Sequence, residues 1–87
     1  MNDHDADTAA LERLADELGT RGYAVTLITA EGRRPTLAVR NPAAPMLTEN
    51  VMADAEWFWW PWADRIALTA DVPAAATTVA RVLAVRE

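Results

Sequence analysis

The chain has 87 residues and a formal net charge of −5, and it contains neither cysteine nor lysine. Without cysteine, disulfides and thiolate metal sites are excluded, and the acidic balance disfavours general binding to nucleic-acid phosphates. The length allows one domain, residues 1–87, and the 52% hydrophobic content is enough for one core.

The start of the chain and the length of its apolar runs suggest where in the cell the protein is located. Its acidic start has no apolar segment typical of a secretory signal, and no apolar run approaches the ~18–20 residues that span a bilayer. We therefore predict a cytoplasmic protein, and we expect residues 1–6 to be disordered.

A helix is predicted near the start. Asp7 or Thr8 supplies its N-cap, and Gly19 or Gly22 ends it. Apolar residues at helical spacing form one stripe along it: Leu11, Leu14, Ala15 and Leu18. This face of the helix is expected to pack on the core.

Alternation of apolar and polar residues then predicts four strands, over residues 23–29, 36–40, 46–52 and 56–60. A turn at Gly32 joins the first two, and two prolines within residues 41–45 end the second. A second helix follows, capped by Asp71 with Pro73 in its first turn.

The predicted order is therefore α-β-β-β-β-α. Short connections favour an antiparallel meander, and two amphipathic helices need a common surface. We expect an α+β fold with both helices packed on one face of the sheet, which leaves the other face open.

Residues for covalent catalysis are scarce. The chain has no serine, cysteine or lysine, and its one histidine, His4, lies in the N-terminal tail. Its three glycines form no phosphate-binding loop and no dinucleotide fingerprint. The sequence favours a protein that is not an enzyme, with no catalytic residue and no cofactor.

Carboxylates around one predicted hairpin raise the possibility of a metal site. Glu49, Asp54 and Glu56 could offer three oxygens to Ca²⁺ or Mg²⁺. Their spacing fits no calcium-binding loop, so we expect solvated side chains and no metal.

The arginines raise the possibility of an anion site. Arg33 and Arg34 share a hairpin tip, Arg40 and Arg65 lie at strand ends, and Arg21 could join them. We expect these arginines to pair with nearby carboxylates instead and to protect the sheet edge from aggregation.

The most distinctive feature is the aromatic segment, residues 57–62, which holds all four tryptophans and the only phenylalanine. Four tryptophan side chains can bury about 600–1,000 Å² of surface. The largest apolar patch that a soluble monomer exposes is usually about 300–600 Å², so the four are not expected to be exposed together. On an extended strand Trp57 and Trp59 oppose Phe58 and Trp60, so one pair is expected in the core and the other on the open face.

The residues that follow this strand limit its position in the sheet. Pro61 cannot donate to a ladder, so the strand is expected to lie at an edge or to end there. The direction of Trp62 is not set by the sequence.

Four segments together resemble a known group of proteins. They are residues 11–15 (LERLA), 21–25 (RGYAV), 39–42 (VRNP) and 57–62 (WFWWPW). The chain resembles small uncharacterised α+β proteins of actinobacterial genomes, over most of its length. That group has no assigned activity, so the resemblance implies no function.

We predict a non-catalytic protein–protein interaction or accessory module that uses the aromatic strand and the open sheet face. The partner is a second copy, giving a homodimer, or another protein, and neither nucleic acid nor membrane is expected. The candidate interaction or ligand-binding residues are Trp57, Phe58, Trp59, Trp60, Trp62, Glu49, Arg40 and Arg65.

Two alternatives stay open. The first is a binder of a small apolar or aromatic molecule, such as a biosynthetic intermediate, in a Trp-lined pocket between sheet and helices where an arginine or Glu49 orients the ligand. The second is an enzyme that works without a nucleophile by shaping such a pocket.

Overall fold

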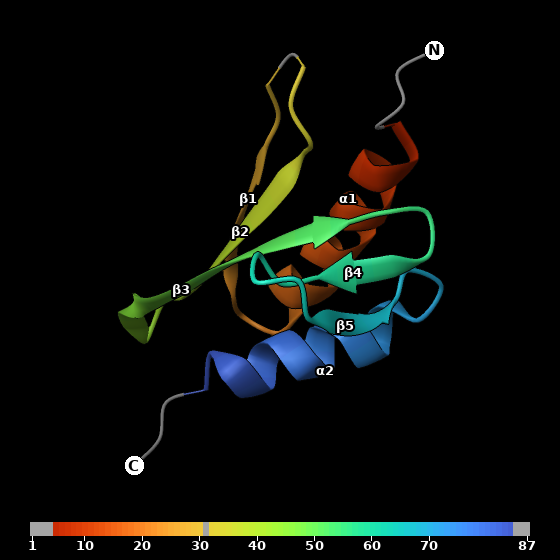
Figure 1. The fold of residues 1–87 in the computed structure, drawn as a ribbon. Helices are drawn as coiled ribbons and strands as arrows, with labels where there is room; N and C mark the ends of the chain where they lie inside the picture. The colour runs from red at the N-terminus through yellow and green to blue at the C-terminus, as the bar shows by residue number, and fades with distance from the viewer. Residues whose placement is uncertain (1–4, 31, 85–87) are drawn as a thin grey trace.

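The computed structural model describes residues 5–30 and 32–84, which form two helices and five strands. Each strand is antiparallel to the next in a sheet of order β1-β2-β3-β4-β5 (Figure 1). The predicted α+β fold, a meander between two helices, is confirmed. The elements are α1 (Asp5–Thr20), β1 (Ala24–Ile28), β2 (Thr36–Asn41), β3 (Ala44–Ala53), β4 (Trp57–Trp59), β5 (Arg65–Leu68) and α2 (Val72–Val82).

The first helix starts earlier than its capping residues predict. Asp5 and Ala6 already belong to α1, ahead of the predicted N-cap at Asp7 or Thr8. The prediction that residues 1–6 are disordered is therefore wrong for residues 5 and 6, while residues 1–4 lie outside the described part of the chain.

The predicted apolar stripe of α1 forms the centre of the core. Leu11, Leu14 and Leu18 are fully buried. The helix ends where Gly22 takes a positive φ of 92°, and the Tyr23 amide donates to the Leu18 carbonyl at 3.1 Å. Glycine is suited to this ending because it adopts the left-handed conformation without steric cost.

The second helix begins as predicted. The Asp71 carboxylate accepts a hydrogen bond from the Ala74 amide at 3.3 Å, and Pro73 occupies the first turn. Such a cap satisfies an amide that has no partner inside the helix. The buried side of α2 consists of Ala75, Ala76 and Val79.

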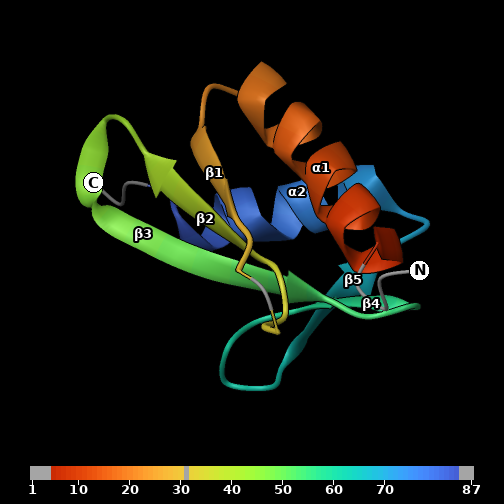
Figure 2. The same cartoon turned by 90° about the horizontal axis from the view of Figure 1, so that it is seen from above.

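Both helices cover the same face of the sheet. Leu37 and Val39 of β2 are fully buried in the cluster that also holds the leucines of α1 and the alanines of α2. In Figure 2 both helices lie on one side of β3, and the connection from β4 to β5 projects on the other side. We call this other side the open face, which is formed by the strand residues that alternate with the buried ones.

The fifth strand, β5, was not predicted. It is four residues long and pairs with β4 through Phe58–Ala67 and Trp57–Leu68. With β5 on its outer side, β4 is an internal strand, so the prediction that the aromatic strand lies at an edge is wrong. The alternative is correct, because β4 ends at Trp59, before Pro61.

The two prolines in residues 41–45 do not separate strands as widely as predicted. β3 already starts at Ala44, and it contains Pro45. Asn41 pairs with Ala44 and Arg40 with Thr48, so residues 45–47 bulge out of the ladder. A proline is tolerated there because a bulge residue donates no ladder hydrogen bond.

Candidate interaction surface

The strand geometry of β4 divides the aromatic segment between the two faces of the sheet. Phe58 is fully buried and Trp60 is 5% exposed, and both belong to the core cluster. Trp57 and Trp59 are half-buried. They alternate with Phe58 and therefore lie on the open face. The predicted split is present, and the structure assigns Phe58 and Trp60 to the core.

Arg65 covers the two open-face tryptophans. Its guanidinium carbon lies 4.8 Å from the ring centroid of Trp57 and 5.5 Å from that of Trp59. The contact arises because Arg65 is the register partner of Trp59 on the neighbouring strand. A cation over an indole face is stabilised by about 0.5–1 kcal/mol at an exposed site, so this pairing restrains the Arg65 side chain.

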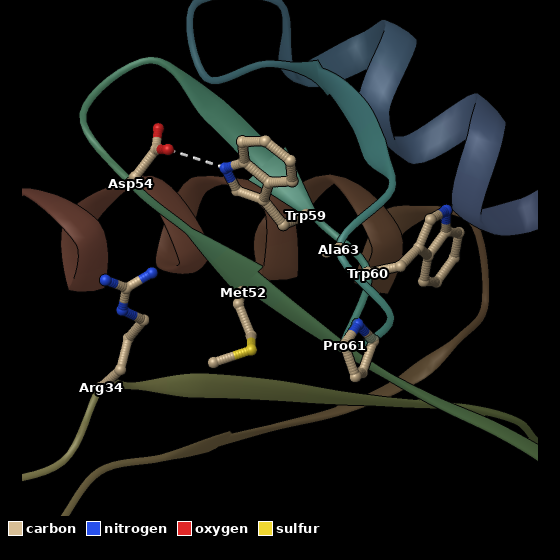
Figure 3. A pocket seen from close by; sticks show the side chains of 7 residues that line it. All are labelled: Arg34, Met52, Asp54, Trp59, Trp60, Pro61 and Ala63. Atoms are coloured by element: carbon tan, nitrogen blue, oxygen red, sulfur yellow. Dashed lines mark hydrogen bonds between the residues drawn. The ribbon is translucent and has the colours of Figure 1, made fainter.

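Asp54 contacts the same two tryptophans through hydrogen bonds. One carboxylate oxygen accepts the amides of Glu56 and Trp57 at 2.8 and 2.7 Å, and the other accepts Trp59 Nε1 at 2.7 Å (Figure 3). The carboxylate therefore closes the β3–β4 turn and fixes the orientation of the Trp59 indole.

The ionisation of Asp54 follows from these contacts. Burial acts to raise the pKa of Asp54, but the hydrogen bonds from the Trp57, Glu56 and Trp59 N–H groups and the nearby Arg34 charge outweigh it. The pKa of this carboxyl is therefore lower than its ordinary value, and the side chain is ionised at neutral pH.

A hollow of about 270 Å³ lies beside Trp59 on the open face. Figure 3 shows the Arg34 and Asp54 side chains on one side of it, Met52 between β3 and β2, and the Trp60 ring directed away toward α2. Its lining combines two opposite charges with apolar surface: Arg34, Met52, Asp54, Trp59, Trp60, Pro61 and Ala63.

A second hollow, of about 360 Å³, occupies the opposite end of the open face. Small side chains on β1 and β2 create it, because these strands carry alanine and threonine on the open face and leucine and valine on the opposite face. The residues that line it are Ala24, Thr26, Ala38, Arg40, Pro45 and Thr48. Arg40 is the one charged group of this lining.

Trp62 lies in the turn between β4 and β5. Its ring stacks on Trp60, with centroids 5.1 Å apart and planes 6° from parallel, and its Nε1 donates to the Asp64 carboxylate at 2.8 Å. The Trp62 side chain remains 53% exposed. It therefore links the buried tryptophan to the surface of the turn.

Three of the residues predicted for the interaction surface do not lie on the open face. Glu49 pairs with buried Val39 and so points to the helix side of the sheet. Phe58 and Trp60 belong to the core, although Trp60 also contributes to the lining of the hollow beside Trp59. The three carboxylates considered as metal ligands do not form a site. Asp54 accepts hydrogen bonds from N–H donors, and no cluster of three or more candidate ligands exists within residues 5–30 and 32–84.

The arginines are arranged differently from either expectation. Arg21 lies on the helix side, where it bonds Glu17 at 3.0 Å and Thr77 at 3.0 Å. Arg34, Arg40 and Arg65 lie on the open face. Among the described residues, Arg40 and Arg65 form no ion pair, so the expected pairing with carboxylates is not present for these two.

Sequence reasoning missed the roles of Arg34, Met52 and Asp54 in the surface. One signal was available for Asp54: an aspartate two and three residues before the amides of Glu56 and Trp57 is the pattern of a side chain that closes a turn. Met52 and Arg34 come next to Trp59 only through strand pairing, which the sequence does not show.

Comparisons of the chain with family models, with curated proteins and with solved structures found no match. The resemblance to small actinobacterial proteins therefore stays a prediction. None of the helices in the described part of the chain is long and apolar enough to cross a membrane.

Proposed function

We propose that the protein is a non-catalytic interaction module, and that its contact surface is the open face centred on Trp57, Trp59 and Arg65. The observation that supports this proposal most directly is the pair of half-buried tryptophans on a face that neither helix covers. Tryptophan and arginine are the residue types that most often dominate binding energy at protein interfaces.

The state of these side chains before binding also supports the proposal. Asp54 holds the Trp59 indole through a 2.7 Å hydrogen bond, and Arg65 rests on both rings. Side chains that are already ordered lose little conformational freedom on binding, so more of the contact energy appears as affinity. The two hollows, one beside Trp59 and one around Arg40, are depressions that side chains of a partner can fill.

The partner in this proposal is another protein chain, and a second copy is the first one to test. Homodimers are the commonest soluble assemblies, and a domain of this size gains from a partner that covers more surface. We place the module in the cytoplasm, in keeping with a chain without cysteine. The absence of serine, cysteine and lysine leads us to propose binding rather than covalent catalysis.

The experiment compares Trp57→Ala with Phe58→Ala, neighbours on opposite faces of β4. Phe58→Ala should lose about 3–5 kcal/mol of unfolding free energy, because it empties a fully buried site. Trp57→Ala should keep the fold but weaken association by about 2 kcal/mol or more. Thermal melting measures the first effect, and light scattering over a concentration series, together with partner titration, measures the second.

Two results would contradict the proposal. If Trp57→Ala unfolds the chain as Phe58→Ala does, the open-face tryptophans are core residues. If Trp57→Ala changes neither stability nor any association, the contact surface lies elsewhere.

A small apolar or aromatic ligand is a second candidate, favoured by the hollow of about 270 Å³ beside Trp59. The volume suits a ligand of one or two rings, near the lower limit of about 300 Å³ for ligand pockets. The hollow lies on the open face rather than between sheet and helices, and Arg34 rather than Glu49 is placed to orient a ligand. This candidate predicts that one compound of a metabolite panel shifts the tryptophan fluorescence while the mass in solution stays unchanged.

A further inference from the structure

The open face differs in charge from the chain as a whole. The residues that line its two hollows and its aromatic cluster include three arginines, Arg34, Arg40 and Arg65, and one carboxylate, Asp54. Asp64, in the adjoining turn, accepts a hydrogen bond from Trp62. The net charge of the chain is −5, so a mainly basic surface lies on an acidic protein.

The hydrogen-bonding capacity of these arginines is unused within the described residues. The side chains of Arg40 and Arg65 form neither an ion pair nor a hydrogen bond there. Arg34 acts on Asp54 through its charge, but the oxygens of Asp54 already accept three N–H groups. Each guanidinium therefore offers its donors to solvent, in a geometry that matches carboxylates.

Among the three arginines, Arg65 is the one whose guanidinium is positioned by aromatic rings before a partner binds. The rings of Trp57 and Trp59 hold its guanidinium at 4.8 and 5.5 Å, while the residue itself is exposed. An arginine restrained on an aromatic face presents its N–H edge in a preferred direction, so a carboxylate can bind it in bidentate fashion at a smaller entropic cost.

We propose that the occupant of the open face is an acidic segment of another protein, with one of its carboxylates bound by Arg65. This inference rests on the proposed function and specifies the partner's chemistry. Charge complementarity selects this occupant over a second copy docked open face to open face. Such a dimer would bring two mainly basic faces together, and like charges across an interface are strongly unfavourable.

The spacing of the arginines sets the length of the segment. Arg40 and Arg65 are three strands apart, and the register places them four residues apart along the strand direction. At about 4.8 Å per strand and about 3.3 Å per residue, they are separated by about 20 Å. An extended segment of about six residues spans this distance and can place an apolar side chain in each hollow.

A protein segment is favoured over a nucleic acid for a geometric reason. Single-stranded nucleic acids bind such sheets by stacking bases on open aromatic faces. Here the Arg65 guanidinium covers the faces of Trp57 and Trp59, and Trp62 stacks on Trp60. The overall charge of −5 also repels an extended polyanion, whereas a short acidic segment contacts the arginines alone.

The test starts from a random peptide library, selected against the full chain. Asp and Glu should be enriched among the selected peptides, and their affinity should fall as salt is raised. The best peptide is then titrated into Arg65→Glu and into Arg13→Glu, a matched charge reversal on exposed α1. Arg65→Glu should weaken binding about tenfold or more, and Arg13→Glu should have little effect.

The other outcomes separate this inference from the proposed function. If Trp57→Ala weakens the peptide but charge reversal at Arg65 does not, the open face is an interface and the acidic partner is wrong. If Trp57→Ala has no effect on any selected peptide, the proposed function itself fails. An absence of selected peptides, or selection of neutral or basic ones, overturns the inference. So does a single-stranded DNA oligonucleotide that binds more tightly than the peptide and depends on Arg65.

Discussion

Asp54 connects the candidate surface to the β3–β4 turn. Its carboxylate binds two backbone amides of the β3–β4 turn and the indole N–H of Trp59. An ionised acceptor makes hydrogen bonds about twice as strong as a neutral one. The same residue type that suggested a cation ligand in the sequence is therefore used to order a tryptophan.

We expect Asp54→Asn to lower the unfolding free energy by about 1–2 kcal/mol at pH 7. The amide can still accept the turn amides, but its NH₂ group then opposes Trp59 Nε1, so two donors meet. The pKa of Asp54 is lower in the folded chain, so the ionised carboxylate stabilises the fold above the unfolded pKa of about 3.9. That contribution disappears as the pH falls through the folded pKa.

The measurement is denaturant unfolding of both proteins from pH 7 down to about pH 3. The difference between wild type and Asp54→Asn should be full at pH 7 and shrink below about pH 4. Glu56→Gln, which removes an exposed carboxylate from the same turn, is the control and should have little effect. A difference that stays constant with pH would assign the loss to shape rather than to charge.

At the scale of the secondary-structure elements, long periodic segments were predictable and short ones were not. The leucine stripe of α1 and the Asp71 cap of α2 each carry a local signal that the structure retains. β5 has four residues, including only one β-branched residue, Ile66, and it is stabilised by pairing with β4. Tertiary contacts of this kind leave no periodicity in the sequence.

The candidate surface was predictable to a similar extent. Alternation along residues 57–60 predicted two opposed aromatic pairs, but it did not reveal which pair the helices cover. Arg65 could be named as a strand-end residue, whereas its contact with Trp57 and Trp59 depends on the register of the missed strand β5. Arg34 reaches the surface through the β1–β2 hairpin, whose direction relative to β4 is set by the sheet alone.

The turn between β4 and β5 contains a strained residue. Ala63 has a φ of 70°, in the left-handed region, although it carries a side chain. An L-residue there is about 1–2 kcal/mol less favourable than in the right-handed region, and glycine lacks this penalty. We expect Ala63→Gly to raise the unfolding free energy by about 0.5–1 kcal/mol.

A matched substitution tests the conformational cause. Ala55→Gly, at an exposed position in the β3–β4 turn, should lower the unfolding free energy by roughly 0.5 kcal/mol, because glycine makes the unfolded chain more flexible. Opposite signs for the two variants in thermal or chemical unfolding support the strain at Ala63. A loss of stability in both would contradict it.

At the scale of the whole molecule, charge is separated across the sheet. The exposed side of α1 carries Glu12 and Asp16 beside Arg13, while the open face carries Arg34, Arg40 and Arg65 beside Asp54. The net charge of −5 conceals this separation, because it sums both sides. The resulting field orients a charged partner before contact, which raises the rate of productive encounters.

The short ladder between β3 and β4 has a consequence for the uniqueness of this surface. Met52 pairs with Trp59 and Ala53 with Phe58, and beyond these two pairs the Asp54 amide donates to the Trp57 carbonyl at 3.0 Å. All residues from 57 to 60 are aromatic, so a slip of one residue would exchange the two pairs between core and open face with little change in buried apolar area. Hydrophobicity alone therefore does not select the observed register. The hydrogen bond from Trp59 Nε1 to Asp54 favours it, together with the pairing of β4 with β5, so this carboxylate helps to determine which tryptophans a partner meets.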